Sequence, residues 1–130
     1  MAQLRHIAPQ SVQALQAHDR AKIEADARAA GEQVVQIDLS ACRSKQDVLD
    51  AIARGFGFAD WFGANLDALY DSLTDLEAQG DHGYVVLLEH VPTTHDFDAH
   101  TRDALLDAFR DAAEFHAETR LPFRVFYGLD

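Results

Sequence analysis

The chain has 130 residues, of which 48% are hydrophobic, and a formal net charge of −11. This length and composition are typical of one globular domain with a core of ordinary size, and no second domain is expected. The longest apolar run, Tyr84 to Leu88, is far too short to cross a bilayer. The first ten residues lack the apolar segment of a secretory signal, and Cys42 is the single cysteine, so we expect a cytoplasmic protein.

The negative charge is concentrated in the second half of the chain. Between Asp60 and Glu118 there are fourteen acidic residues and only two basic ones, Arg102 and Arg110. Such a field repels nucleic acid and anionic lipid and attracts basic proteins. We therefore expect neither nucleic acid nor a membrane as partner. Acidity that serves only solubility is the alternative interpretation.

The N-terminal segment is predicted to be helical. The stretch Ser11 to Ala30 is rich in alanine, with Ser11 as a plausible N-cap and Gly31 as the stop. Its apolar stripe is thin, so this helix is expected to dock loosely or to pair with something. Residues 1–32 are accordingly interpreted as an N-terminal helical extension.

A strand and a helix are predicted next. Val34 to Leu39 is short and β-branched, which indicates a strand. Ser44 then opens a helix with Asp47 three residues later, an arrangement similar to a capping box. Gly55 or Gly57 is expected to end this helix.

The segment from Phe58 to Asp75 combines an aromatic loop with an acidic helix. Asn65 is the expected N-cap of this helix, and its inner stripe consists of Leu66, Leu69, Tyr70, Leu73 and Leu76. Its aspartates lie four residues apart: Asp67, Asp71 and Asp75. Side chains so spaced are neighbours on a helix, and each like-charged pair costs about 0.2–0.5 kcal/mol. No Lys or Arg in the segment offsets this repulsion, so a cation supplied by a partner is a natural hypothesis.

The remaining elements complete an α/β pattern. Tyr84 to Glu89 is apolar on both faces, as expected for a strand in the middle of a sheet. A long helix from about Asp98 to Thr119 is predicted to end before Pro122, and Phe123 to Tyr127 indicates a closing strand. Helical crossovers favour a mostly parallel, three-stranded sheet with right-handed connections.

A second acidic stripe runs along the long helix. Asp103, Asp107 and Asp111 recur every four residues, and Arg110 offsets their repulsion only in part. Either acidic stripe alone is more typical of a solvated helix face than of a site. Two stripes beside an aromatic loop favour a protein interface, because Trp61 and Phe62 are the kind of residue that anchors one.

The motifs of common enzymes are absent from the sequence. It has no glycine-rich phosphate loop, no G-x-S-x-G turn and no cysteine with a convincing histidine partner. His90, His95 and His100, together with Asp96 and Asp98, are concentrated in one loop, but their spacing matches no defensible ligand pattern. A metal-dependent enzyme is therefore a minor hypothesis, and no cofactor is expected.

The run WFGANLDALYDSLT, residues 61–74, resembles the signature of the barstar family, intracellular inhibitors of barnase-like bacterial ribonucleases. The family pattern is aromatic-aromatic-Gly-x-Asn-Leu-Asp-Ala-Leu-aromatic-Asp-x-Leu-Thr, and this chain meets every position. The similarity extends from about Val34 to Leu129, so residues 33–130 are interpreted as a barstar-like domain. The resemblance implies a three-stranded parallel sheet surrounded by helices.

The resemblance also implies a mechanism, in which the loop and the following helix plug a ribonuclease active site. Asp71 aligns with the aspartate that occupies the place of an RNA phosphate. The motif Phe109-Arg110-Asp111 is similar to the family's Phe-Arg-Glu, which makes Asp111 the counterpart of a glutamate that meets basic side chains of the enzyme. With Phe62 from the aromatic loop and Asp75 included, the candidate partner-binding residues are Trp61, Phe62, Gly63, Asn65, Asp67, Tyr70, Asp71, Thr74, Asp75 and Asp111.

Three positions depart from the best-known family member. Trp61 replaces a tyrosine, Tyr70 replaces a tryptophan, and Asp75 replaces a glycine. Such changes can exclude one nuclease and admit another. The leading hypothesis is a ribonuclease inhibitor that is not itself an enzyme and is a monomer on its own. The target would be a barnase-like ribonuclease or a related toxin nuclease. An acidic regulatory module for a basic partner that is not a nuclease is the main alternative.

Overall fold

The computed structural model describes residues 10–15, 20–58, 65–76, 83–118 and 121–129. The elements follow the chain in this order: β1 (Gln10–Ala14), α1 (Arg20–Ala29), β2 (Gln33–Asp38), α2 (Lys45–Phe56), α3 (Leu66–Thr74), β3 (Tyr84–Val91), the short 3₁₀ helix η4 (His95–Phe97), α4 (Ala99–Glu118) and β4 (Phe123–Leu129). The predicted α/β class is thereby confirmed.

The sheet has four strands in the order β1-β4-β3-β2, and every neighbouring pair is parallel. The expected three-stranded sheet is therefore wrong by one strand. The added strand, β1, lies inside the segment predicted to be helical from Ser11, and the helix begins only at Arg20. The reason is tertiary: β1 pairs with β4 along its whole length, and strand pairing overrides the weak helix propensity of a five-residue stretch.

The strand predicted to be central is an interior strand. β3 lies between β4 and β2, and its first five residues, Tyr84 to Leu88, are buried. A row of valines crosses the sheet in register, since Val86 aligns with Val35 on one side and with Val125 on the other. Val125 in turn aligns with Val12 of β1. These β-branched side chains form part of the larger core.

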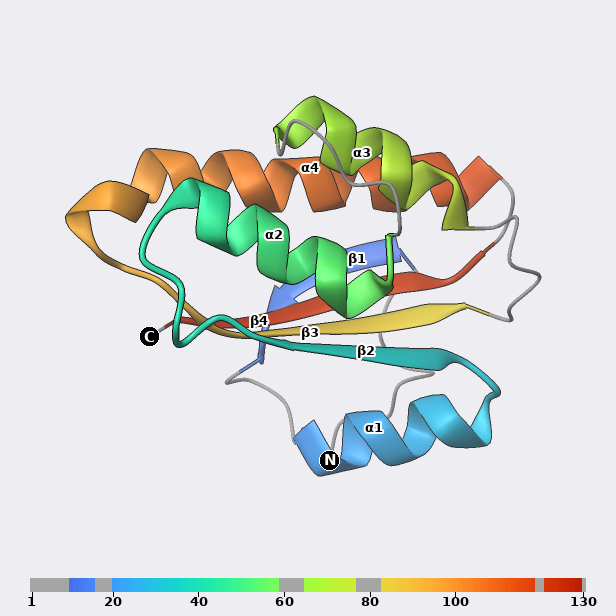
Figure 1. Ribbon diagram of the computed structural model, residues 1–130. Coiled ribbons are helices and arrows are strands. Elements are labelled where there is room, and N and C mark those ends of the chain that lie inside the picture. Colours follow the sequence, from blue (N-terminus) through green and yellow to red (C-terminus); the bar gives the residue numbers. More distant parts are fainter. Residues whose placement is uncertain (1–9, 16–19, 59–64, 77–82, 119–120, 130) are drawn as a thin grey trace.

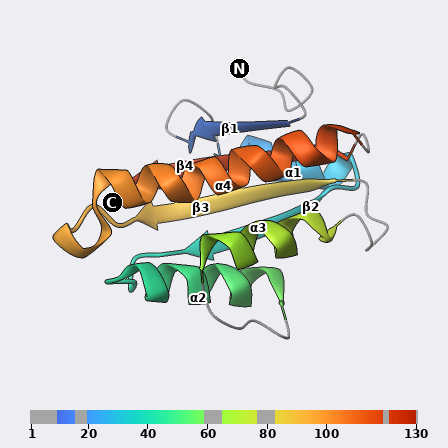
Figure 2. The same ribbon diagram turned by 90° about the horizontal axis from the view of Figure 1, so that it is seen from above.

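Helices cover both faces of the sheet (Figure 1). On one face lie α2, α3 and α4, and α1 lies on the other. Seen from above, α4 runs on the β1 side, α2 runs along β2, and α3 lies between these two helices (Figure 2). Burial of Leu69 and Leu73 on α3 and of Leu105 and Phe109 on α4 fixes how the two helices sit on the sheet.

The second face of the sheet carries a smaller core beneath α1. Ile23 and Ala27 of α1 are buried against the sheet side chains Val85, Leu87 and Phe126. Polar contacts flank this patch. Arg20 forms an ion pair with Glu89 at 3.1 Å, and Arg124 forms one with Glu32 at 3.1 Å. The N-terminal segment is thus joined to the sheet by pairing, apolar packing and charge.

The predicted caps of α2 and α3 are confirmed, whereas the N-cap predicted at Ser11 is wrong, because Ser11 lies in strand β1. The Ser44 side chain accepts a hydrogen bond from the backbone N–H of Asp47 at 3.2 Å, and Gly57 ends α2 with φ 76°. That left-handed conformation favours glycine. Asn65 begins α3 by accepting a hydrogen bond from the N–H of Ala68 at 2.7 Å. None of the helices in the described ranges is long and apolar enough to cross a membrane.

Candidate protein-binding face

The buried apolar residues of helix α3 set its orientation and leave its acidic side chains on the exposed side. Leu69 and Leu73 are fully buried, so Asp67 and Asp71 project from the exposed side of the helix. Asp67 lies in the first turn, where the helix dipole stabilises a carboxylate. Asp71 is in the middle of the helix, and its backbone oxygen accepts a hydrogen bond from the Thr74 hydroxyl at 2.9 Å. Asp75 is exposed and is the C-cap, so the predicted line of three aspartates ends just past the helix.

Helix α4 carries the second acidic stripe. Asp98 accepts hydrogen bonds from the backbone N–H and the hydroxyl of Thr101, both at 2.9 Å, at the start of this helix. These hydrogen bonds hold the pKa of Asp98 below its usual range. Farther along, Asp107 pairs with Arg110 at 2.8 Å, whereas Asp111 and Glu114 have exposed side chains on the same helix. The stripe therefore remains strongly negative.

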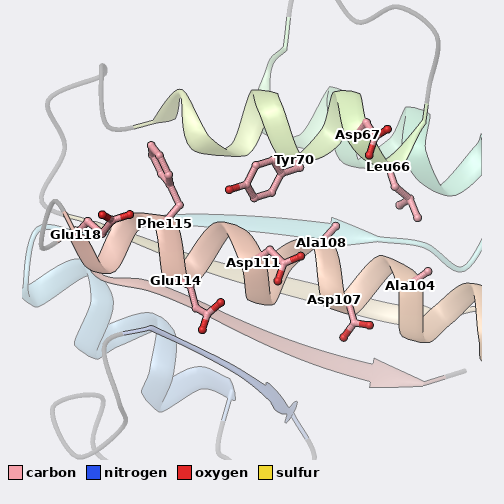
Figure 3. A pocket seen from close by; sticks show the side chains of 10 residues that line it. All are labelled: Leu66, Asp67, Tyr70, Ala104, Asp107, Ala108, Asp111, Glu114, Phe115 and Glu118. Carbon is pink, nitrogen blue, oxygen red and sulfur yellow. The ribbon is translucent and has the colours of Figure 1, made fainter.

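A groove of about 630 Å³ lies between α3 and α4 (Figure 3). Among the residues that the structure describes, five carboxylates line it and no lysine or arginine does. The Tyr70 ring projects into it from α3 and the Phe115 ring from α4. Its lining residues are Leu66, Asp67, Tyr70, Ala104, Asp107, Ala108, Asp111, Glu114, Phe115 and Glu118. The groove thus combines apolar surface, two aromatic rings and negative charge.

Three of the predicted site residues line this groove, namely Asp67, Tyr70 and Asp111. The packing of α3 against α4 brings them together from positions more than forty residues apart in sequence. Four others, Asn65, Asp71, Thr74 and Asp75, belong to α3 or its caps but do not line the groove. Trp61, Phe62 and Gly63 lie outside the described residues.

Sequence reasoning did not identify Phe115, which lines the groove. It is 36% exposed, and within the described ranges Leu129 is the only other large hydrophobic side chain with substantial exposure. The sequence did contain an indication of this position. Phe115 follows the predicted contact Asp111 by four residues, which places both on the same side of a helix. Glu114 and Glu118 of the acidic stripe also line the groove, although only Asp111 was predicted as a contact.

A buried histidine connects the two helices behind the groove. The His116 side chain is fully buried, and its Nε2 lies 2.8 Å from the backbone oxygen of Leu73. A carbonyl oxygen only accepts, so Nε2 is the donor of this hydrogen bond. The ring also packs against those of Phe115 and Phe123, with centroid distances of 5.5 and 5.2 Å. His116 thereby fixes the last turn of α3 against α4.

The histidines predicted to share one loop belong to different elements, since His90 lies in β3, His95 in η4 and His100 in α4. His90, His95 and His100 are exposed, and Asp98 is engaged at the start of α4. No group of three or more His, Cys, Asp or Glu side chains within the described ranges is arranged to hold a metal ion. Cys42 is half-buried, and burial, with a smaller contribution from Asp47, raises the pKa of its thiol.

Comparison with known proteins identifies the family. A family model described as barstar (barnase inhibitor) matches residues 32–128. The chain belongs to the barstar family. The α/β fold, with a parallel sheet and surrounding helices, is consistent with a barstar-like fold. A search of curated proteins found no match.

The region matched by the barstar family contains both helices that form the groove. It spans α3 and α4 and begins at Glu32, just before β2. Strand β1 and helix α1 precede it. The acidic groove is therefore built within the barstar region, whereas the fourth strand and the cover on the second face of the sheet come from residues before it.

Proposed function

We propose that this protein is a ribonuclease inhibitor that covers a basic nuclease active site with α3 and the acidic groove beside it. Membership of the barstar family, whose model is described as a barnase inhibitor, carries this proposal. A ribonuclease must bind a polyanion with Arg and Lys side chains. An acidic face competes with RNA for those same groups, and its field also accelerates the encounter.

Asp71 is the proposed mimic of an RNA phosphate. It is exposed in the middle of α3, and the family resemblance aligns it with the aspartate that enters the enzyme. The other proposed contacts on this side are Asn65, Asp67, Tyr70 and Thr74, with Asp75 tuning the choice of partner. Asp111 of α4 is proposed to meet basic side chains at the edge of the active site. Trp61, Phe62 and Gly63 are proposed to contribute from the loop that precedes α3.

The three departures from the best-known family member support a target that differs from barnase itself. We propose a barnase-like ribonuclease or a related toxin nuclease, bound by a monomer in the cytoplasm without a cofactor. We also propose that residues 33–130 form the barstar domain and that residues 1–32 are an extension. The start of the family match at residue 32 supports this division.

The test is protection of RNA from a barnase-like ribonuclease during titration with the protein. Asp71→Asn should weaken inhibition by about 30-fold or more, since interface hot spots contribute about 2 kcal/mol or more. Asp103→Asn is the matched control: Asp103 is an exposed aspartate of α4 that does not line the groove. Inhibition should also weaken as salt is raised.

Two results would count against the proposal. Absence of protection at micromolar excess rules out the ribonuclease chosen as target, and an equal response to Asp71→Asn and Asp103→Asn rules out the assigned contact. Recovery of a basic protein that is not a nuclease, by co-purification from the native cells, would favour the regulatory-module alternative. Recovery of a nuclease would identify the target directly.

A further inference from the structure

The acidic character of α4 does not explain why an aromatic side chain, that of Phe115, is partly exposed on this helix. The side chain is 36% exposed, whereas the next residue, His116, is fully buried. Phe115 therefore keeps part of its ring at the surface although the core lies one residue away. Figure 3 shows this ring projecting from α4 toward α3, along the same groove as the Tyr70 ring.

The groove offers two kinds of surface to a ligand. Its apolar part consists of the two rings together with Leu66, Ala104 and Ala108. Its polar part consists of five carboxylates, on Asp67, Asp107, Asp111, Glu114 and Glu118. Arg110 of α4 pairs with Asp107 at 2.8 Å and lines a neighbouring pocket with Asp111 and Glu114 rather than this groove, so it offsets only part of the negative charge.

This combination restricts the chemistry of the occupant. An apolar side chain would fit the rings but would remove water from carboxylates without replacing their hydrogen bonds, which is costly. A lysine would satisfy the charge, but its ammonium is a compact, strongly hydrated ion. A guanidinium is planar and weakly hydrated, stacks on aromatic faces and donates paired hydrogen bonds to a carboxylate. Arginine satisfies both surfaces at once.

We propose that Phe115, together with Tyr70, makes the groove between α3 and α4 selective for an arginine side chain of the protein partner. The proposal rests on the proposed function for the identity of the partner, but it assigns a specificity-determining role to a residue outside the predicted site. The guanidinium stacks against one or both rings and donates hydrogen bonds to carboxylates of α4. Asp111 and Glu118 are the groove carboxylates on the same side of α4 as Phe115, four residues before it and three residues after it.

The selectivity can be measured without the nuclease, using N-acetyl-arginine amide and N-acetyl-lysine amide as probes. Titration at low ionic strength, followed by NMR, should shift the ring protons of Phe115 and Tyr70 and show tighter binding of the arginine probe. Phe115→Leu should weaken arginine binding about two- to fivefold, the range expected for loss of a cation–π contact at an exposed site. The lysine probe should be affected less.

Two further variants separate the ring from general effects of substitution. Phe115→Tyr keeps an aromatic face and should retain the preference for arginine. Asp103→Asn, which removes a charge from α4 outside the groove, should also retain it. Because Phe115 is already exposed, the leucine variant is expected to keep the native fold, which its NMR spectrum checks directly.

Equal affinity for the two probes, or an arginine preference that persists in Phe115→Leu, overturns the proposal. A second experiment measures inhibition of the ribonuclease. Phe115→Leu should weaken this inhibition, whereas Phe115→Tyr should not. If the ribonuclease is not inhibited by the unaltered protein, the proposed function fails for that target. The probe titration still decides the role of Phe115, so the two failures are distinguishable.

Discussion

The buried ion pair between Arg124 and Glu32 allows a quantitative test of how the N-terminal segment is attached to the sheet. One guanidinium nitrogen of Arg124 lies 3.1 and 3.2 Å from the two carboxylate oxygens of Glu32. The two side chains are only 8% and 9% exposed. Glu32→Leu would remove the carboxylate that pairs with the buried guanidinium. Breaking a buried pair in this way typically costs about 3–5 kcal/mol.

We expect a loss of about 3 kcal/mol for Glu32→Leu, the lower end of that range, because the site retains slight contact with water. The double change Glu32→Leu with Arg124→Met should lie within about 1 kcal/mol of the unaltered protein, since the desolvation cost disappears with both charges. Urea unfolding followed by circular dichroism measures both free energies. A single variant as stable as the double one would refute the reasoning.

The same pair makes a prediction about pH. Burial raises the pKa of Glu32 above its usual value of 4.5, against the opposing effect of Arg124. The folded protein then holds this proton more tightly than the unfolded chain. A protonated Glu32 carboxyl can still accept a hydrogen bond from Arg124, which a leucine at this position cannot. The contribution of Glu32 to the free energy of unfolding is therefore largest below pH 4.5 and decreases as pH rises through the raised pKa. Glu32→Gln should remove this component, and an unchanged pH profile would contradict the assignment.

Three further changes test local features of the binding face. Asn65→Ala should lower the free energy of unfolding by about 1 kcal/mol, because the N–H of Ala68 loses its cap, and thermal unfolding measures the loss. His116→Leu should cost about 1–3 kcal/mol by leaving the buried oxygen of Leu73 without its donor, whereas His116→Gln should restore much of the stability. The Asp98 carboxyl should titrate below its ordinary value of 3.8 in a carbon-13 NMR titration, since it accepts two hydrogen bonds at the start of α4. A midpoint at or above 3.8 would show that these bonds do not persist in solution.

The sequence alone determined the local features of the fold. Ser44 and Asn65 cap the helices that follow them, as predicted, because a short polar side chain satisfies backbone N–H groups of its own first turn. The interior position of β3 followed from apolar residues on both of its faces. The family signature in residues 61–74 led to the barstar family, and the family match over residues 32–128 confirmed it.

The tertiary structure decided which distant segments meet. Residues 10–14 form a strand because the edge of β4, more than a hundred positions away, supplies hydrogen-bonding partners that no local pattern reveals. Asp67 and Asp111 share a groove because apolar stripes pack α3 against α4. A helical pattern also could not tell whether Phe115 faces the core or the groove, since its neighbour His116 is the side chain that fills the buried position. Secondary-structure propensity and helix capping act within a few residues, whereas the burial of a side chain depends on which distant segments pack against it.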